Sequence, residues 1–84
     1  MELENIKMVF KKIKNILSQK LSLNEDDIKL NTRLKEDLGL DSFDAVELVI
    51  ELEKIFHICI KDEAMQHFKK VEDVVEYIKS KITH

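Results

Sequence analysis

One serine in this 84-residue chain stands where its hydroxyl could carry a phosphate ester. Ser42 follows Asp41, a residue type that caps helices, and Phe43 begins an apolar repeat, so Ser42 is expected at the first position of a helix. A phosphate ester there would face the free N–H groups at the positive end of the helix. Asp41 and Asp44 would repel a doubly charged phosphate, so a diester with an outward-pointing arm fits better. Serine and aspartate are also ordinary at helix starts, so a purely structural role stays open.

The helix predicted over residues 42–56 has two separate sets of apolar side chains. On a helical wheel the larger set shares one arc that would face the core, namely Ala45, Leu48, Val49, Leu52, Ile55 and Phe56. Phe43, Val46 and Ile50 lie outside that arc and form a second line, the apolar strip. Either the helix packs on two sides and buries the apolar strip, or the strip is exposed and contacts a partner.

Carboxylates border the apolar strip on both sides. Asp44, Glu47 and Glu51 lie on one side of it, and Glu53 lies on the other. Residues 41–63 hold seven acidic and two basic residues, a net charge of −5, in a chain whose net charge is −3. Phosphate backbones require a basic surface, so nucleic acid is not expected as a partner, whereas a basic protein surface is.

Two other kinds of chemistry do not fit the pattern. No histidine lies near Ser42 in the sequence and no Gly-x-Ser-x-Gly turn surrounds it, so Ser42 is not expected to be a nucleophile and the chain is not expected to be an enzyme. The set His57, Cys59, His67 and His84 matches no zinc-binding spacing, and the acidic clusters lack the glycine of a calcium loop. No metal site is therefore expected.

Composition predicts that helices position these residues. An 84-residue chain with 44% hydrophobic and 37% charged residues suits one small domain, and a single Gly with no Pro leaves helices unbroken. Apolar residues spaced by three and four predict helices over residues 3–20, 42–56 and 71–82, and Asp62 opens a short one. The expected fold is all-α, a small four-helix bundle with three long helices, one short helix and a long loop over residues 22–41.

The long loop is expected to be pinned to the core. Leu30, Leu34 and Leu38 recur along it and are predicted to be its apolar anchors. A loop of this length in a small domain is usually functional.

The cellular location is expected to be the cytoplasm. Cys59 is the only cysteine and cannot form an internal disulfide, which fits a reducing compartment. No apolar run reaches the roughly 18 residues of a membrane span. The N-terminus lacks the apolar core of a signal peptide.

The segment around the serine reads Asp37-Leu38-Gly39-Leu40-Asp41-Ser42-Phe43 and is followed by Val46, Glu47, Leu48 and Val49. With this motif at its centre, the sequence from about Ile6 to Ile82 resembles the acyl carrier protein family. It implies that residues 1–84 form one acyl-carrier domain, expected to be monomeric, with 4'-phosphopantetheine attached to Ser42 beside Asp41. The arm would hold growing acyl chains as thioesters and present them to fatty acid biosynthesis enzymes.

The resemblance also implies two binding surfaces. A phosphopantetheinyl transferase and fatty acid synthesis enzymes with basic docking surfaces would contact Asp41, Phe43, Asp44, Val46, Glu47, Ile50 and Glu53. The acyl chain would lodge in a pocket formed by Leu52, Ile60, Met65 and Phe68.

Several residues depart from the family pattern. Met65 and Phe68 are larger than the residues usual at their positions, which predicts a tighter pocket that opens on loading. Lys69 and Lys70 replace the usual hydroxyl residues before the last helix, which predicts a weak cap there. Two alternatives to fatty acid synthesis stay open, a carrier for amino acids or secondary metabolism and an unmodified or phosphorylated helical interaction module.

Overall fold

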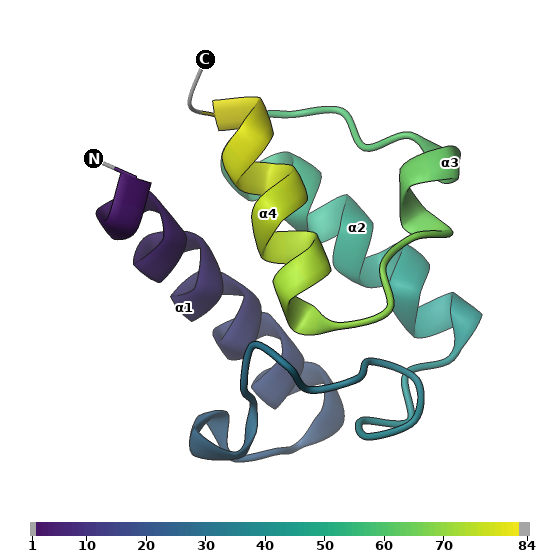
Figure 1. Cartoon of the computed structure of the whole chain (residues 1–84). Helices are drawn as coiled ribbons and strands as arrows, with labels where there is room; N and C mark the ends of the chain where they lie inside the picture. Colours follow the sequence, from purple (N-terminus) through teal and green to yellow (C-terminus); the bar gives the residue numbers. More distant parts are fainter. Residues whose placement is uncertain (1, 83–84) are drawn as a thin grey trace.

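Helices make up most of the computed structural model, which describes the backbone of residues 2–82 and the side chains of residues 6–82 (Figure 1). The elements are α1 (Glu2–Leu21), a short 3-10 helix η1 (Glu25–Asp27), α2 (Ser42–Phe56), α3 (Asp62–Met65) and α4 (Val71–Ile82). The expected all-α fold, with three long helices, one short helix and a long loop between α1 and α2, is confirmed. The first helix extends one residue further at each end than predicted.

The three long helices enclose one hydrophobic core. α1 contacts α4 extensively and also contacts α2. Side chains spaced by three and four turn inward from each helix, and the buried ones include Val9, Ile13 and Leu17 of α1, Leu48, Val49 and Leu52 of α2, and Val71, Val74, Val75 and Ile78 of α4. Each fully buried aliphatic side chain contributes roughly 1.5–3 kcal/mol. Ile55 was predicted to join this core but is exposed, because it lies at the edge of the apolar arc in the last turn of α2.

The long loop between α1 and α2 is docked on the first turn of α4. Three backbone hydrogen bonds join them: Leu34 donates to the Lys69 carbonyl at 2.9 Å, Val71 to the Thr32 carbonyl at 3.0 Å and Glu72 to the Leu30 carbonyl at 2.9 Å. The last two satisfy N–H groups that a helix start leaves without an intrahelical acceptor.

Two of the three predicted loop anchors pack on the core. Leu34 is buried and Leu38 is partly buried against the core. Leu30 was predicted to be an anchor as well, but its side chain is exposed. It holds the loop through its carbonyl oxygen instead, so the apolar side chain is not what fixes this point.

The start of α4 is better capped than the sequence predicted. The Asp73 carboxylate reaches back and accepts hydrogen bonds from the N–H groups of Lys69 at 3.1 Å and Lys70 at 2.9 Å. Lys69 and Lys70 supply no side-chain acceptor to the helix start, as expected from their type. The N–H groups there are satisfied instead by Asp73 from within the helix and by the docked loop.

A charged turn holds the loop just before α2. The Asp37 carboxylate accepts the backbone N–H of Arg33 at 2.8 Å and the guanidinium Nη2 at 3.0 Å. Hydrogen bonding to the Arg33 side chain, and then to its backbone, holds the pKa of Asp37 below its ordinary value. The same pairing raises the pKa of Arg33. Asp37 is thus held in its charged form.

Asp37→Asn should lower the melting temperature at neutral pH, because an amide cannot replace these charge-assisted bonds. A carboxylate whose pKa is lowered by folding stabilises the protein above its unfolded pKa of about 3.9, and this contribution is lost as the pH falls through the folded pKa. The difference in melting temperature between wild type and Asp37→Asn should therefore be constant above about pH 5 and shrink below about pH 4. Asp26→Asn, an exposed aspartate of η1, is the control. A difference that persists unchanged in acid would contradict this role of Asp37.

Candidate functional site

Ser42 opens α2 with its side chain exposed, as predicted. Asp41 adopts an extended backbone, and its Oδ1 accepts the N–H of Asp44 at 2.8 Å, so Asp41 is the cap. The Asp41 carbonyl accepts the N–H of Ala45 at 2.9 Å. The N–H groups of Ser42 and Phe43 are left at the open end of the helix, where an anion attached to Ser42 would meet them.

Gly39 shapes the approach to this helix start. Its φ is +68°, a left-handed conformation that glycine adopts without strain. A Cβ built there would meet nothing within 4 Å, so backbone conformation rather than lack of space calls for glycine. The turn delivers Leu40 into the core, where its N–H bonds to the Leu34 carbonyl at 3.0 Å.

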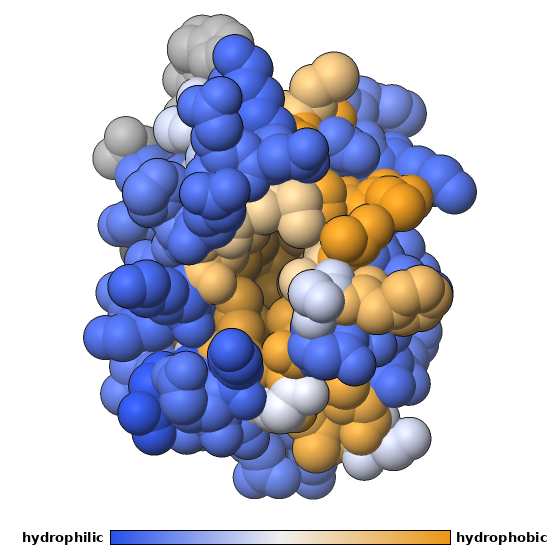
Figure 2. All heavy atoms as spheres, turned by 90° about the vertical axis from the view of Figure 1, so that its right-hand side faces the viewer, coloured by the Kyte–Doolittle hydropathy of each residue, from blue (hydrophilic) through white to orange (hydrophobic). Residues whose placement is uncertain are grey.

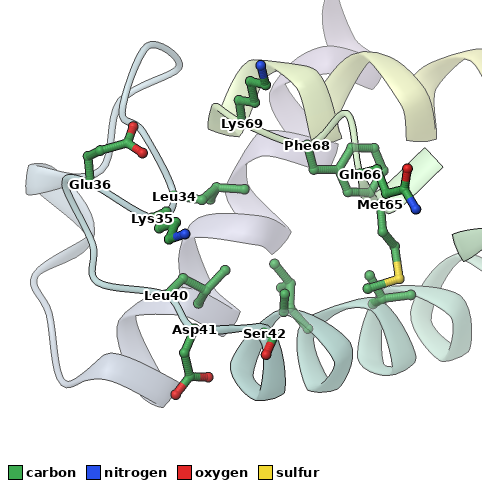
Figure 3. Close-up of a pocket in the computed structure, with 13 residues that line it drawn as sticks. Leu34, Lys35, Glu36, Leu40, Asp41, Ser42, Met65, Gln66, Phe68 and Lys69 are labelled. Atoms are coloured by element: carbon green, nitrogen blue, oxygen red, sulfur yellow. The ribbon is translucent and has the colours of Figure 1, made fainter. Parts of the chain in front are cut away.

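A cavity of about 770 Å³ begins beside Ser42 (Figure 3). Its apolar walls come from the long loop, from α2, from the end of α3 and from the segment between α3 and α4. They comprise Leu34, Leu40, Ala45, Leu48, Val49, Met65 and Phe68. Its polar lining comprises Lys35, Glu36, Asp41, Ser42, Gln66 and Lys69. Figure 2 shows the hollow on this face with apolar residues inside it and around it. An apolar chain attached near Ser42 therefore has a place of suitable volume to enter.

The predicted acyl pocket coincides only in part with this cavity. Met65 and Phe68 line it, and both are partly buried. Leu52 and Ile60 do not line it but are buried in the hydrophobic core. Residue type alone could not distinguish the cavity-lining residues from the core residues, because the core and the cavity walls are both apolar. The cavity walls from the long loop, Leu34 and Leu40, were missed because that loop is positioned by its contacts with the start of α4, far along the chain, and these have no sequence signal.

The apolar strip on α2 is exposed. Phe43 has 70% of its surface exposed, and Val46 and Ile50 have 46% and 44%. Of the two possibilities that the sequence left open, burial on a second side of the helix is excluded. An exposed line of three large apolar side chains beside Ser42 is a surface suited to protein contact.

The acids that border the apolar strip are not equivalent. Asp44 makes no ion pair among the described residues, whereas Glu47 Oε1 lies 3.3 Å from Lys20 Nζ. Glu53 is half-buried, and its Oε2 accepts the N–H of Ile60 at 2.7 Å. Neither contact was predicted, since Lys20 lies 27 residues before Glu47 and the Ile60 group belongs to the backbone. The role of these acids in partner binding stays a prediction.

Two kinds of feature are absent from the described part of the chain. Over residues 6–82, whose side chains the structure describes, no three His, Cys, Asp or Glu side chains are grouped in a way that could hold a metal ion. Over residues 2–82, no helix combines the length and apolar character that a membrane span requires.

These features are typical of a carrier protein: a small helical body with an exposed serine at a helix start, an apolar cavity beside it and an exposed apolar strip. A family model described as "phosphopantetheine attachment site" matches residues 11–78. The acyl carrier protein of Phytoplasma australiense is 55% identical over 89% of this chain and 99% of its own length. That of Clostridium perfringens strain SM101 is 49% identical over 83% of this chain and 92% of its own. A solved structure of the Enterococcus faecalis acyl carrier protein superposes with a TM-score of 0.78 at 32% identity, covering 89% of this chain and 95% of that one.

The chain belongs to the acyl carrier protein family. It is an acyl carrier that bears covalently bound phosphopantetheine.

Phe43→Ala should change the free energy of unfolding by no more than about 0.5 kcal/mol, because the side chain is mostly exposed. Leu52→Ala, on the same helix but fully buried, should cost about 2–5 kcal/mol. Urea unfolding of both variants measures the difference. A large loss of stability in Phe43→Ala would show that the apolar strip is part of the core.

Proposed function

We propose that Ser42 is the attachment residue for 4'-phosphopantetheine and that the chain presents growing acyl chains to enzymes of fatty acid biosynthesis. The observation that carries this proposal is the exposed hydroxyl of Ser42 at an open helix start, on the rim of an apolar cavity. We further propose that residues 1–84 act as one monomeric carrier domain in the cytoplasm, where the free thiol of Cys59 suits a reducing compartment.

The residues around Ser42 fit such an attachment. A phosphodiester at Ser42 would lie at the positive end of α2, an arrangement worth about 0.3–1 kcal/mol at an exposed helix start. When bound, the group supplies a thiol that holds acyl chains as thioesters. Asp41 holds the helix start through the N–H of Asp44 and leaves the Ser42 hydroxyl toward solvent. The cavity walls, including Leu48 and Met65, would exclude water from an apolar chain.

The chemistry of attachment is proposed to belong to a separate enzyme. No histidine is among the residues that line the cavity beside Ser42, and we propose that a separate enzyme supplies the base that takes the hydroxyl proton. A phosphopantetheinyl transferase would activate the hydroxyl against coenzyme A. This transferase and the synthesis enzymes would meet the apolar strip, and their basic groups would be attracted by Asp41 and Asp44.

Ser42→Ala should fold as the wild type does and accept no phosphopantetheine. The side chain is exposed and makes no hydrogen bond that holds the helix, since the cap is Asp41. Intact mass after incubation with coenzyme A and a bacterial phosphopantetheinyl transferase measures the modification, and circular dichroism checks folding. Ser18→Ala, a serine of α1, is the control and should be modified normally. A modified Ser42→Ala protein would refute the assignment, and so would a wild type that gains only a phosphate or nothing.

Met65→Ala should widen the cavity, destabilise the unloaded carrier by about 1–3 kcal/mol and regain stability when a long acyl chain fills the space. The measurement is thermal melting of unloaded, short-acyl and long-acyl forms. Leu52→Ala is the matched control, because Leu52 is core and does not line the cavity, so its loss should not be relieved by chain length. Equal dependence on chain length in wild type and Met65→Ala would remove Met65 from the acyl site.

A further inference from the structure

A lysine of α1 is paired with an acid of the proposed docking surface. Lys20, in the last turn of α1, places Nζ 3.3 Å from Oε1 of Glu47 on α2. The Lys20 side chain is 19% exposed and the Glu47 side chain 46% exposed. The pair therefore joins two helices, and its acidic member remains at the surface.

This pairing changes what a basic partner meets. A lysine and a glutamate in contact have no net charge, so their field falls off with distance much faster than that of a free carboxylate. Asp41, Asp44 and Glu51 make no ion pair among the described residues, so their charges are not cancelled in this way. With a screening length of about 10 Å at 0.1 M salt, a partner's cation is attracted by these three and little by Glu47.

We propose that Lys20 is a built-in counter-ion that withholds Glu47 from basic partner proteins. A partner can use this carboxylate only by displacing Lys20, so docking is weaker than the acidic residues of α2 alone imply. The inference rests on the proposed function, since it concerns the same docking surface. It makes Lys20, a residue outside α2, a determinant of how strongly transferases and synthesis enzymes bind.

Lys20→Met tests this directly, with Lys12→Met as the matched control. Both remove one positive charge from α1, but Lys12 is exposed and pairs with no acid of the docking surface. The readout is kcat/KM for modification by a bacterial phosphopantetheinyl transferase at low and high salt. Lys20→Met should raise kcat/KM about fivefold at low salt, since a unit charge at 4 Å in water contributes about 1 kcal/mol. The gain should shrink at high salt, and Lys12→Met should give less than about a twofold change.

Glu47→Gln provides a second test of the proposal. It should lower kcat/KM far more in the Lys20→Met background than in wild type, because only there is the carboxylate available to the partner. Equal losses in the two backgrounds, or equal gains in Lys20→Met and Lys12→Met, would overturn the proposal. In either case a wild type that is still modified leaves the proposed function intact, whereas a wild type that is not modified refutes that function itself.

A charge exchange keeps the test valid if Lys20→Met fails to fold. The double variant Lys20→Glu, Glu47→Lys retains an ion pair of no net charge between α1 and α2. It should be modified about as fast as wild type, while Glu47→Lys alone should be slower because it adds a free cation to the surface. If the exchanged pair is as slow as Glu47→Lys, the Glu47 carboxylate contacts the partner directly and Lys20 does not withhold it.

Discussion

The docking of the long loop on the start of α4 is the constraint on which the candidate site depends. The carbonyls of Leu30 and Thr32 accept N–H groups of the first turn of α4, and the Lys69 carbonyl accepts the N–H of Leu34. A buried N–H group left without an acceptor would cost about 1–3 kcal/mol, so loop and helix hold each other in place. This mutual fixation presents Leu34 to the cavity beside Ser42. At this point α2 meets the long loop, the end of α3 and the segment between α3 and α4. The space left between them is the cavity.

The starts of α2 and α4 differ in how their N–H groups are satisfied. At α4, Asp73 reaches back to the N–H groups of Lys69 and Lys70, and the loop supplies further acceptors. At α2, the Asp41 carboxylate accepts the N–H of Asp44, and the beginning of the helix stays open to solvent. The closed start is structural because it fixes the loop. The open start is where the positive end of a helix remains available to a covalently attached anion.

Local features could be predicted from the sequence, and contacts between distant segments could not. Apolar spacing located the three long helices, and the Asp41–Ser42 pair located the start of α2, because caps and periodicity act over a few residues. The exposure of the apolar strip, by contrast, depends on whether another element covers it, and sequence leaves that open. Leu52 and Met65 are both apolar, but only the fold places one in the core and the other on the cavity wall. The contacts Lys20–Glu47 and Glu53–Ile60 have no sequence signal at all.

Charge on this surface follows from contacts rather than from composition. Glu47 is paired with Lys20 and Glu53 is held by the backbone of Ile60, so two acids that border the apolar strip are engaged within the protein. Asp41 and Asp44 flank Ser42 and make no ion pair among the described residues. Glu51, further along α2, makes no ion pair among these residues either, so the acids without a cationic partner include two beside Ser42 and one in the second half of the helix. We propose that a basic partner is attracted by Asp41 and Asp44 beside Ser42, so that the carboxylate that caps the helix also helps to orient the carrier with Ser42 toward the enzyme.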